Sequence, residues 1–275
     1  MTHTTFTSES SMRATRLHKR KLENSGMENQ ERLLDLALNK YRLSPQVVAA
    51  YKKLPRHLFI KRSYSMDEMY GDYPLEIYRD EKYISTISQP SFVMLMIDML
   101  DLKPGHKVLE LGAGSGWNAA LMGEIVGPAG KVVSVEIIPS LAQETKDNLS
   151  FLGIANVEII SGDGATGYPP EAPYDRGIFT AGATDLPKAF HEQIKVGGKL
   201  LFVLKTQSID LLLLLIKKED HFEELSRLSC SFVPMKGQKA ARITNDLDTL
   251  RDTQGKLEIY PNFKKEGRDS LFSIT

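Results

Sequence analysis

A glycine-rich run near the middle of the chain has the spacing of a ligand-binding loop. It comprises Glu110, Leu111, Gly112, Ala113, Gly114, Ser115 and Gly116. An apolar strand pattern precedes it and a helical pattern follows. The glycines allow a tight turn and a close approach to a ligand, and the start of the helix offers free N–H groups. The run therefore predicts a binding loop for a small polar molecule.

Two details separate this loop from the loops that bind dinucleotides. A dinucleotide fingerprint has its third glycine three residues after the second, where this chain has Trp117, and here the third glycine comes early, at Gly116. Glu110 also stands directly before the loop, which suits a net-cationic zwitterion better than a pyrophosphate. The phosphate-binding motif with Gly-Lys-Ser/Thr is absent from the sequence.

Acidic residues follow the next two strand patterns. Glu136 ends the second pattern, where a carboxylate can accept both hydroxyls of a ribose, and Asp163 with Gly164 follows the third. There the acid can accept the amino group of an adenine, and the glycine lets the ring lie flat. Because parallel strands end at one edge of a sheet, these groups and the glycine loop predict a site for a nucleoside cofactor.

The elements that must position these residues alternate regularly. We expect strands at residues 107–111, 131–136, 157–161, 176–180 and 199–204, and helices at 118–126, 139–152 and 186–194. This order predicts an α/β, Rossmann-like fold with a mostly parallel sheet. Two further strand patterns, at 210–217 and 225–232, have no helix between them and predict an antiparallel hairpin at the C-terminal edge.

The rest of the chain divides into appendages. Residues 1–27 are expected to be a disordered tail, with a transit peptide as the alternative, and residues 28–105 form a region of helices and substrate loops. That region has helical patterns at 28–42 and after Pro45, a loop-rich stretch at 64–89 and a helix opened by Pro90. The binding domain is expected at 106–236, followed by an extension at 237–275.

Composition narrows the classes of function. The 275 residues are 41% hydrophobic and 25% charged, and 35 Lys and Arg balance 35 Asp and Glu, which disfavours a nucleic-acid or membrane-surface binder. The single cysteine, Cys230, excludes an intrachain disulfide, and no His or Cys spacing predicts a metal site. No apolar run reaches the roughly 20 residues of a membrane span. We expect a cytoplasmic monomer.

Ordered motifs outside the glycine loop resemble one family. The most specific is Thr86-Ile87-Ser88-Gln89-Pro90, which matches a Thr-Ile-Ser-x-Pro signature. Tyr70 to Ile77 keeps a Tyr-x-Asp-x-Pro-Leu-x-Ile pattern, and Leu54 to Phe59 resembles Val-Pro-Arg-x-x-Phe. Residues 172–176 and 232–234 match in order as well. Over residues 30–236 the chain thus resembles the protein-L-isoaspartate O-methyltransferases, which are class I S-adenosylmethionine-dependent methyltransferases.

The resemblance implies an activity and a site. It implies methylation of isoaspartyl or aspartyl side-chain carboxylates in peptides or damaged proteins. It assigns the cofactor S-adenosylmethionine to Gly112, Gly114, Gly116, Glu136, Asp163 and Gly164, with Glu110 and Ala113 beside them, and the substrate to Thr86, Ile87, Ser88 and Val233. It places the Ser88 hydroxyl at the reacting centre, whereas the position of Ser88 alone would favour a helix N-cap. A carboxylate is already ionised at neutral pH, so no general base is required.

Departures from the family pattern leave the substrate open. Residues 78–85 are bulkier and longer than the glycine-bearing lead-in of the family, and Ser231 stands where the family often has arginine. One alternative is a methyltransferase of the same fold that tailors one dedicated peptide, and another is an RNA methyltransferase. A third, of a different class, is a non-catalytic adaptor, against which the intact glycines and acids argue.

Overall fold

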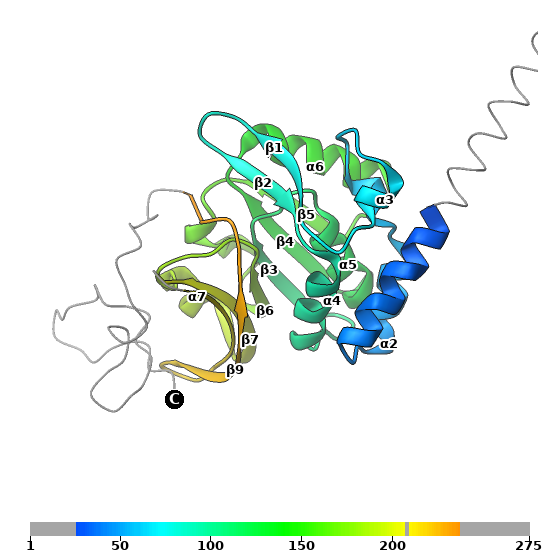
Figure 1. Ribbon diagram of the computed structural model, residues 1–275. Helices are drawn as coiled ribbons and strands as arrows, with labels where there is room; N and C mark the ends of the chain where they lie inside the picture. The colour runs from blue at the N-terminus through cyan, green and yellow to red at the C-terminus, as the bar shows by residue number, and fades with distance from the viewer. Residues whose placement is uncertain (1–25, 207–208, 237–275) are drawn as a thin grey trace, which may run out of the picture.

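The computed structural model describes residues 26–206 and 209–236 (Figure 1). A helix already covers residues 26–40, so the last two residues of the expected tail are helical. The remainder of that tail and the extension at 237–275 lie outside the described residues. Within the described ranges, no helix is long and apolar enough to cross a membrane.

Short helices build the N-terminal region. After the helix over 26–40 come α2 (Pro45–Lys53), the 3-10 helix η1 (Arg56–Phe59) and α3 (Met66–Met69). Proline at the first position of α2 starts that helix, and its last turn ends at Leu54, before Pro55. Helix α2 packs on α4 and α5, on the right of the sheet in Figure 1, and α3 contacts η1.

The stretch at 64–89, expected to be loop-rich, also contains a β-hairpin. Strands β1 (Leu75–Arg79) and β2 (Ile84–Ile87) pair antiparallel, with a bulge near Tyr78. The turn lacks a glycine; instead the Asp80 carboxylate accepts hydrogen bonds from the N–H groups of Lys82, at 2.8 Å, and Tyr83, at 2.6 Å. The hairpin stands at the upper end of the main sheet, above β4 and β5 (Figure 1).

The main sheet has seven strands in the order β5-β4-β3-β6-β7-β8-β9. Its parallel part consists of β3 (Lys107–Leu111), β4 (Lys131–Glu136), β5 (Val157–Ser161), β6 (Tyr174–Phe179) and β7 (Ile194–Lys205). The strands on either side of β3 are therefore β4, which follows it in the chain, and β6, which follows after β5. This reversal of strand order opens a crevice at the carboxyl end of β3.

The expected antiparallel edge is confirmed. Strand β8 (Asp210–Lys217) pairs antiparallel with β7, and β9 (Phe222–Cys230) pairs antiparallel with β8. The last strand begins and ends earlier than the expected 225–232. After β9, Pro234 forms an isolated parallel bridge with Gly182, which follows β6.

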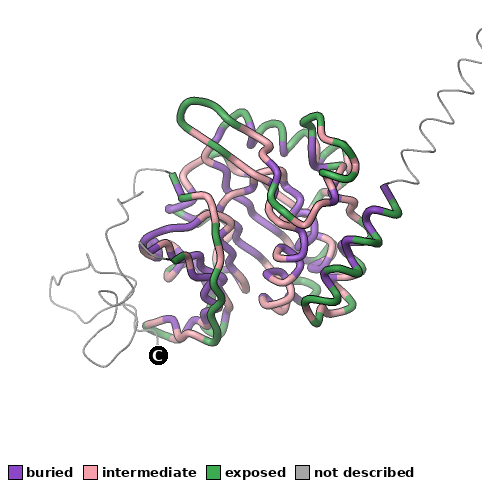
Figure 2. Tube along the Cα trace, in the orientation of Figure 1, coloured by how far each residue is buried: buried purple, intermediate pink, exposed green. Residues whose placement is uncertain are grey.

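Helices cover both faces of the sheet. On one side lie α4 (Pro90–Met99), α5 (Trp117–Val126) and α6 (Pro139–Phe151), and on the other lies α7 (Lys188–Gln193) (Figure 1). One hydrophobic core runs from Leu33 to Met235, and the purple strands of Figure 2 mark its centre. Residues 28–105 and residues 106–236 both contribute to this core. The domain boundary that the sequence suggested at residue 105 stays a prediction.

Candidate functional site

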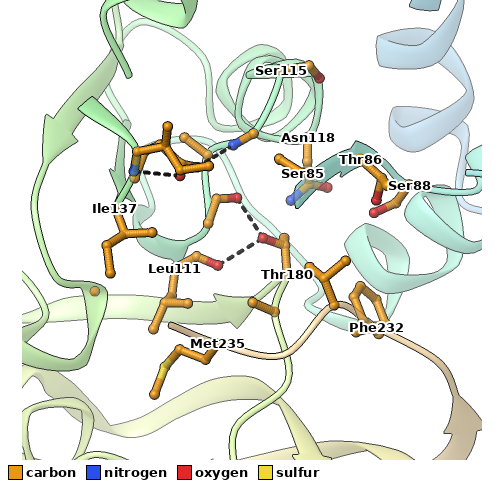
Figure 3. A pocket seen from close by; sticks show the side chains of 18 of the residues that line it. Ser85, Thr86, Ser88, Leu111, Ser115, Asn118, Ile137, Thr180, Phe232 and Met235 are labelled. Atoms are coloured by element: carbon orange, nitrogen blue, oxygen red, sulfur yellow. Dashed lines mark hydrogen bonds between the residues drawn. The ribbon is translucent and has the colours of Figure 1, made fainter. Parts of the chain in front are cut away.

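A cleft of about 950 Å³, partly open to solvent, lies at the carboxyl ends of β3, β4 and β6. The hairpin, the glycine loop and the segment after β9 form its walls. Of the residues that the sequence predicted for a site, nine line it: Thr86, Ile87, Ser88, Gly112, Ala113, Gly114, Glu136, Gly164 and Val233. They come from segments up to about half the chain apart, and the fold brings them to one place (Figure 3).

The glycine loop needs its glycines for backbone geometry. Gly112 and Gly114 have positive φ angles of 96° and 52°, where other residues are strained. A Cβ atom on Gly112 would also lie 2.4 Å from the Thr180 hydroxyl. That hydroxyl is within 2.8 Å of the Leu111 carbonyl oxygen and 2.6 Å of the Gly112 carbonyl oxygen (Figure 3). Strand β6 thus secures the loop that follows β3.

Glu136 secures the same loop from the other side. Its carboxylate accepts hydrogen bonds from the N–H groups of Gly114, at 2.9 Å, and Ile138, at 3.1 Å. The residue is 4% exposed. Burial raises the pKa of Glu136, and the hydrogen bonds from Gly114 and Ile138 work against that rise. The carboxylate oxygens keep further lone pairs with which they can accept ligand hydroxyls.

Glu110 lies beneath the cleft and does not line it. It is fully buried, and its carboxylate accepts hydrogen bonds of 2.5 Å from the Asn118 amide and the Ser134 hydroxyl. Asn118, from the first turn of α5, does line the cleft. A direct contact between Glu110 and a ligand, as the sequence suggested, therefore does not fit this position; Glu110 holds Asn118 instead.

Gly116 and Asp163, which the sequence predicted for the cofactor site, do not line the cleft either. Gly116 is the N-cap of α5 with a φ of 79°, and a Cβ atom there would lie 2.6 Å from the Thr145 methyl group. Asp163 caps the short 3-10 helix η2 (Gly164–Thr166) by accepting a hydrogen bond from the Ala165 N–H at 3.0 Å. Asp163 thereby places Gly164, which does line the cleft.

Ser88 is free of the helix-capping role that its position alone suggested. The N-cap of α4 is Gln89, and the N–H of Ser91 in the first turn is bonded by the Asp72 carboxylate at 2.9 Å. Thr86 and Ser88 lie beside each other at the end of β2, on the side of the cleft opposite Ile137 (Figure 3). The Ser88 side chain thus belongs to the cleft wall.

The sequence placed residues 78–85 beside the substrate, and three of them, Tyr83, Ile84 and Ser85, line the cleft. Other lining residues were not predicted from the sequence: Asn118, Ile137, Thr180, Ala181, Phe232 and Met235. The sequence did contain a signal for Thr180, which is its position at the carboxyl end of a parallel strand. It directly follows β6, just as Glu136 ends β4. No signal pointed to Met235, whose place depends on hydrogen bonds between residues 182 and 233–235. Within the described residues, no three His, Cys, Asp or Glu side chains are arranged to hold a metal ion.

The reversal of strand order at β3, the glycine loop and the acid at the end of β4 define a class I methyltransferase. The chain belongs to the protein-L-isoaspartate(D-aspartate) O-methyltransferase family, whose sequence model matches residues 27–240. It is 43% identical over 212 residues to protein-L-isoaspartate O-methyltransferase 2 of Archaeoglobus fulgidus. The matched residues make up 77% of this chain and 94% of that protein. A Methanopyrus kandleri protein-L-isoaspartate O-methyltransferase is 44% identical, over 76% of this chain and 90% of that protein.

Solved structures agree with this membership. A protein-L-isoaspartate O-methyltransferase with 33% identity superposes with a TM-score of 0.72, over 77% of this chain and 67% of that chain. A Plasmodium falciparum structure of the same family, in complex with S-adenosyl-L-homocysteine, has a TM-score of 0.63 and 22% identity, over 76% of this chain and 98% of that chain. The second likeness concerns the fold alone.

The buried Glu110 makes stability depend on pH. Burial raises the pKa of Glu110 from an ordinary 4.5 to about 7. The folded state therefore favours the protonated form of Glu110. The contribution of this group to stability is complete below the pKa of the unfolded state and is lost as the pH rises through the pKa of the folded state. Between about pH 5 and about pH 8, Glu110→Gln should gain about 2–3 kcal/mol of unfolding free energy relative to the native protein. Urea unfolding of both proteins at the two pH values measures this difference.

Glu110→Gln is a suitable comparison because the glutamine amide can still accept a hydrogen bond from Asn118 and can donate one to Ser134. If both proteins change in parallel with pH, the Glu110 carboxyl does not titrate in this range.

Proposed function

We propose that this chain transfers the methyl group of S-adenosylmethionine to the side-chain carboxylate of isoaspartyl residues in proteins or peptides. The observation that carries the proposal is that the glycine loop and the Ser88 segment line one cleft. A cofactor and an acceptor can therefore meet there without any rearrangement of the sheet. Membership of the family supports the same reaction.

The cleft suits an adenosine-containing cofactor. The backbone of Gly112, Ala113 and Gly114 is open to it, and the Glu136 carboxylate at the end of β4 can accept both ribose hydroxyls. Gly164, positioned by Asp163, leaves a flat surface for the adenine ring, since it has no side chain. When bound, the sulfonium of S-adenosylmethionine supplies an electrophilic methyl group.

Catalysis then consists mainly of orientation. The acceptor carboxylate, with an ordinary pKa near 4, is already ionised at neutral pH, so the protein has no proton to remove. Ser88 can donate a hydrogen bond to the carboxylate oxygen that does not attack, while Thr86 and Ile87 line the same wall. The Phe232 ring packs against Phe92 at 6.0 Å between ring centroids, which helps to exclude water. Holding the reactants in line can lower the barrier by several kcal/mol.

Glu136→Ala should weaken S-adenosylmethionine binding by roughly 2–4 kcal/mol, because two charge-assisted hydrogen bonds to the ribose are lost. Calorimetric titration of the folded variant measures the affinity. Glu136→Gln is the matched control, since it retains the size of the side chain and one carbonyl acceptor, and it should lose less. Undiminished affinity in Glu136→Ala would remove Glu136 from the cofactor site.

Ser88→Ala should lower turnover by roughly ten- to a thousandfold while the affinity for S-adenosylmethionine stays nearly unchanged. Its melting temperature should also stay the same, because the structure gives the N-cap of α4 to Gln89. The matched control is Ser91→Ala, which removes the hydrogen bond of 2.8 Å from the Ser91 hydroxyl to Asp72. That control should melt at a lower temperature and keep its turnover; the reverse pattern for Ser88 would make Ser88 structural.

The hairpin bears on the choice of substrate. Tyr83, Ile84 and Ser85 line the cleft, where the family carries a shorter, glycine-bearing segment that lets a peptide approach closely. We expect methylation of an isoaspartyl peptide, in preference to its aspartyl counterpart or transfer RNA. The specificity constant should be about tenfold or more below that of an ordinary family member. Shortening residues 78–85 to a glycine-containing turn should recover part of that difference.

Asp80→Ala serves as the control, because it removes the hydrogen bonds that order the turn but leaves its length unchanged. Methyl incorporation into each acceptor is the measurement. Preference for transfer RNA would overturn the proposed function. Equal use of isoaspartyl peptides by this chain and a relative would show only that the hairpin does not select the substrate.

A further inference from the structure

A buried arginine lies behind the cleft wall that carries Ser88. Arg56 begins η1 and is fully buried. Its guanidinium donates to five backbone carbonyl oxygens, those of Met69 (2.6 Å), Gly71 (3.3 Å), Tyr73 (3.1 Å), Ile87 (3.3 Å) and Ser88 (3.1 Å). One side chain therefore ties η1 to the turn before β1 and to the end of β2.

Carbonyl dipoles surround this charge. Burial lowers the pKa of Arg56 to about 10, so the group stays protonated at neutral pH. In the described part of the chain, no carboxylate forms an ion pair with it. The guanidinium carbon also lies 5.9 Å from the centre of the Trp117 ring, which lines the cleft. A charge held in this way is costly to bury and sensitive to geometry, because each carbonyl must point at a fixed N–H group.

Two of these carbonyls belong to the peptide groups on either side of the Ser88 α-carbon. Both accept from the same guanidinium nitrogen, at 3.3 Å for Ile87 and 3.1 Å for Ser88. Fixing the two peptide planes fixes the backbone angles of Ser88 and hence the direction of its Cα–Cβ bond. The Asp72 carboxylate fixes the next turn by accepting from the N–H of Ser91 at 2.9 Å.

We propose that Arg56 is a positioning residue for methyl transfer, which holds the peptide groups on both sides of Ser88 so that its hydroxyl faces the acceptor carboxylate. This role rests on the proposed function, because it needs Ser88 to touch the acceptor. A purely structural Arg56 would stabilise the fold but would not act through Ser88. The two roles differ in how the effects of substitutions at Arg56 and Ser88 combine.

A double-mutant cycle tests the proposal with Arg56→Lys, Ser88→Ala and both together. A lysine ammonium has only three N–H donors and no planar fork, so it cannot hold five carbonyls. Arg56→Lys alone should lower kcat by about tenfold or more, with the Kd for S-adenosylmethionine changed less than about twofold. In the Ser88→Ala background the same substitution should lower kcat less than about threefold, since residues that act as a unit are not additive.

Arg176→Lys is the matched control. Arg176 also donates to backbone carbonyls, those of Leu100 at 2.6 Å, Asp175 at 2.8 Å and Asp101 at 3.2 Å, but near the start of β6, at the end opposite the cleft. Its substitution should lower the melting temperature and leave kcat unchanged.

Other outcomes would overturn the proposal. They are multiplicative effects of the two substitutions on kcat, a Ser88→Ala variant with normal kcat, or a loss of kcat in Arg176→Lys as large as in Arg56→Lys. If Arg56→Lys does not fold, Arg56→Gln replaces it in the cycle, and failure of both to fold would make Arg56 structural. Absence of methyl transfer to isoaspartyl peptide by the native protein would instead refute the proposed function, before any variant is compared.

Discussion

The backbone of the loop after β3 is the constraint on which the site depends. It leaves the sheet in positive-φ conformations, so its peptide groups need partners other than a strand. Neighbouring elements supply them: Glu136 accepts from the Gly114 N–H at 2.9 Å, and the Thr145 hydroxyl donates to the Gly114 carbonyl at 2.6 Å. Thr180 donates to the carbonyls on the β6 side. Two of the three side chains that satisfy the loop, Glu136 and Thr180, thus also line the cleft.

The N-terminal region attaches to this centre by a different interaction. Arg56 gathers carbonyls from residues 69–73 and 87–88, and the Trp117 side chain donates to the Leu54 carbonyl at 3.0 Å. The first contact joins η1 to the hairpin strands, and the second joins α2 to the first turn of α5. The cleft wall that carries Ser88 is therefore attached to the helix that follows the glycine loop, and one hydrophobic core spans both regions.

The sequence predicted those parts of the structure whose geometry is encoded in residue type. Glycines mark the positive φ angles of the loop, and short, nearly continuous apolar runs mark the parallel strands and the first strand of the edge hairpin. The β1–β2 hairpin was missed because Asp80 orders its turn through side-chain hydrogen bonds, without the glycine that usually marks such turns. The carbonyl cluster around Arg56 was invisible because a lone arginine is normally expected at the surface. Such features depend on contacts between distant segments, which local patterns do not encode.

Two buried acids lie close together at this end of the sheet: Glu136 lines the cleft, and Glu110 lies beneath it. Burial raises the pKa of both Glu110 and Glu136, and the Glu136 charge raises that of Glu110 further. Two neighbouring carboxylates oppose each other's ionisation, so carrying both charges lowers the stability of the folded protein. The proposed cofactor is net cationic at its sulfonium end. A positive ligand in the cleft favours the ionised form of both acids, so ligand binding and carboxylate ionisation must strengthen each other to the same extent. By the same linkage, a negatively charged group in the cleft would oppose the ionisation of Glu136 and Glu110, so the two acids favour a cationic ligand over an anionic one.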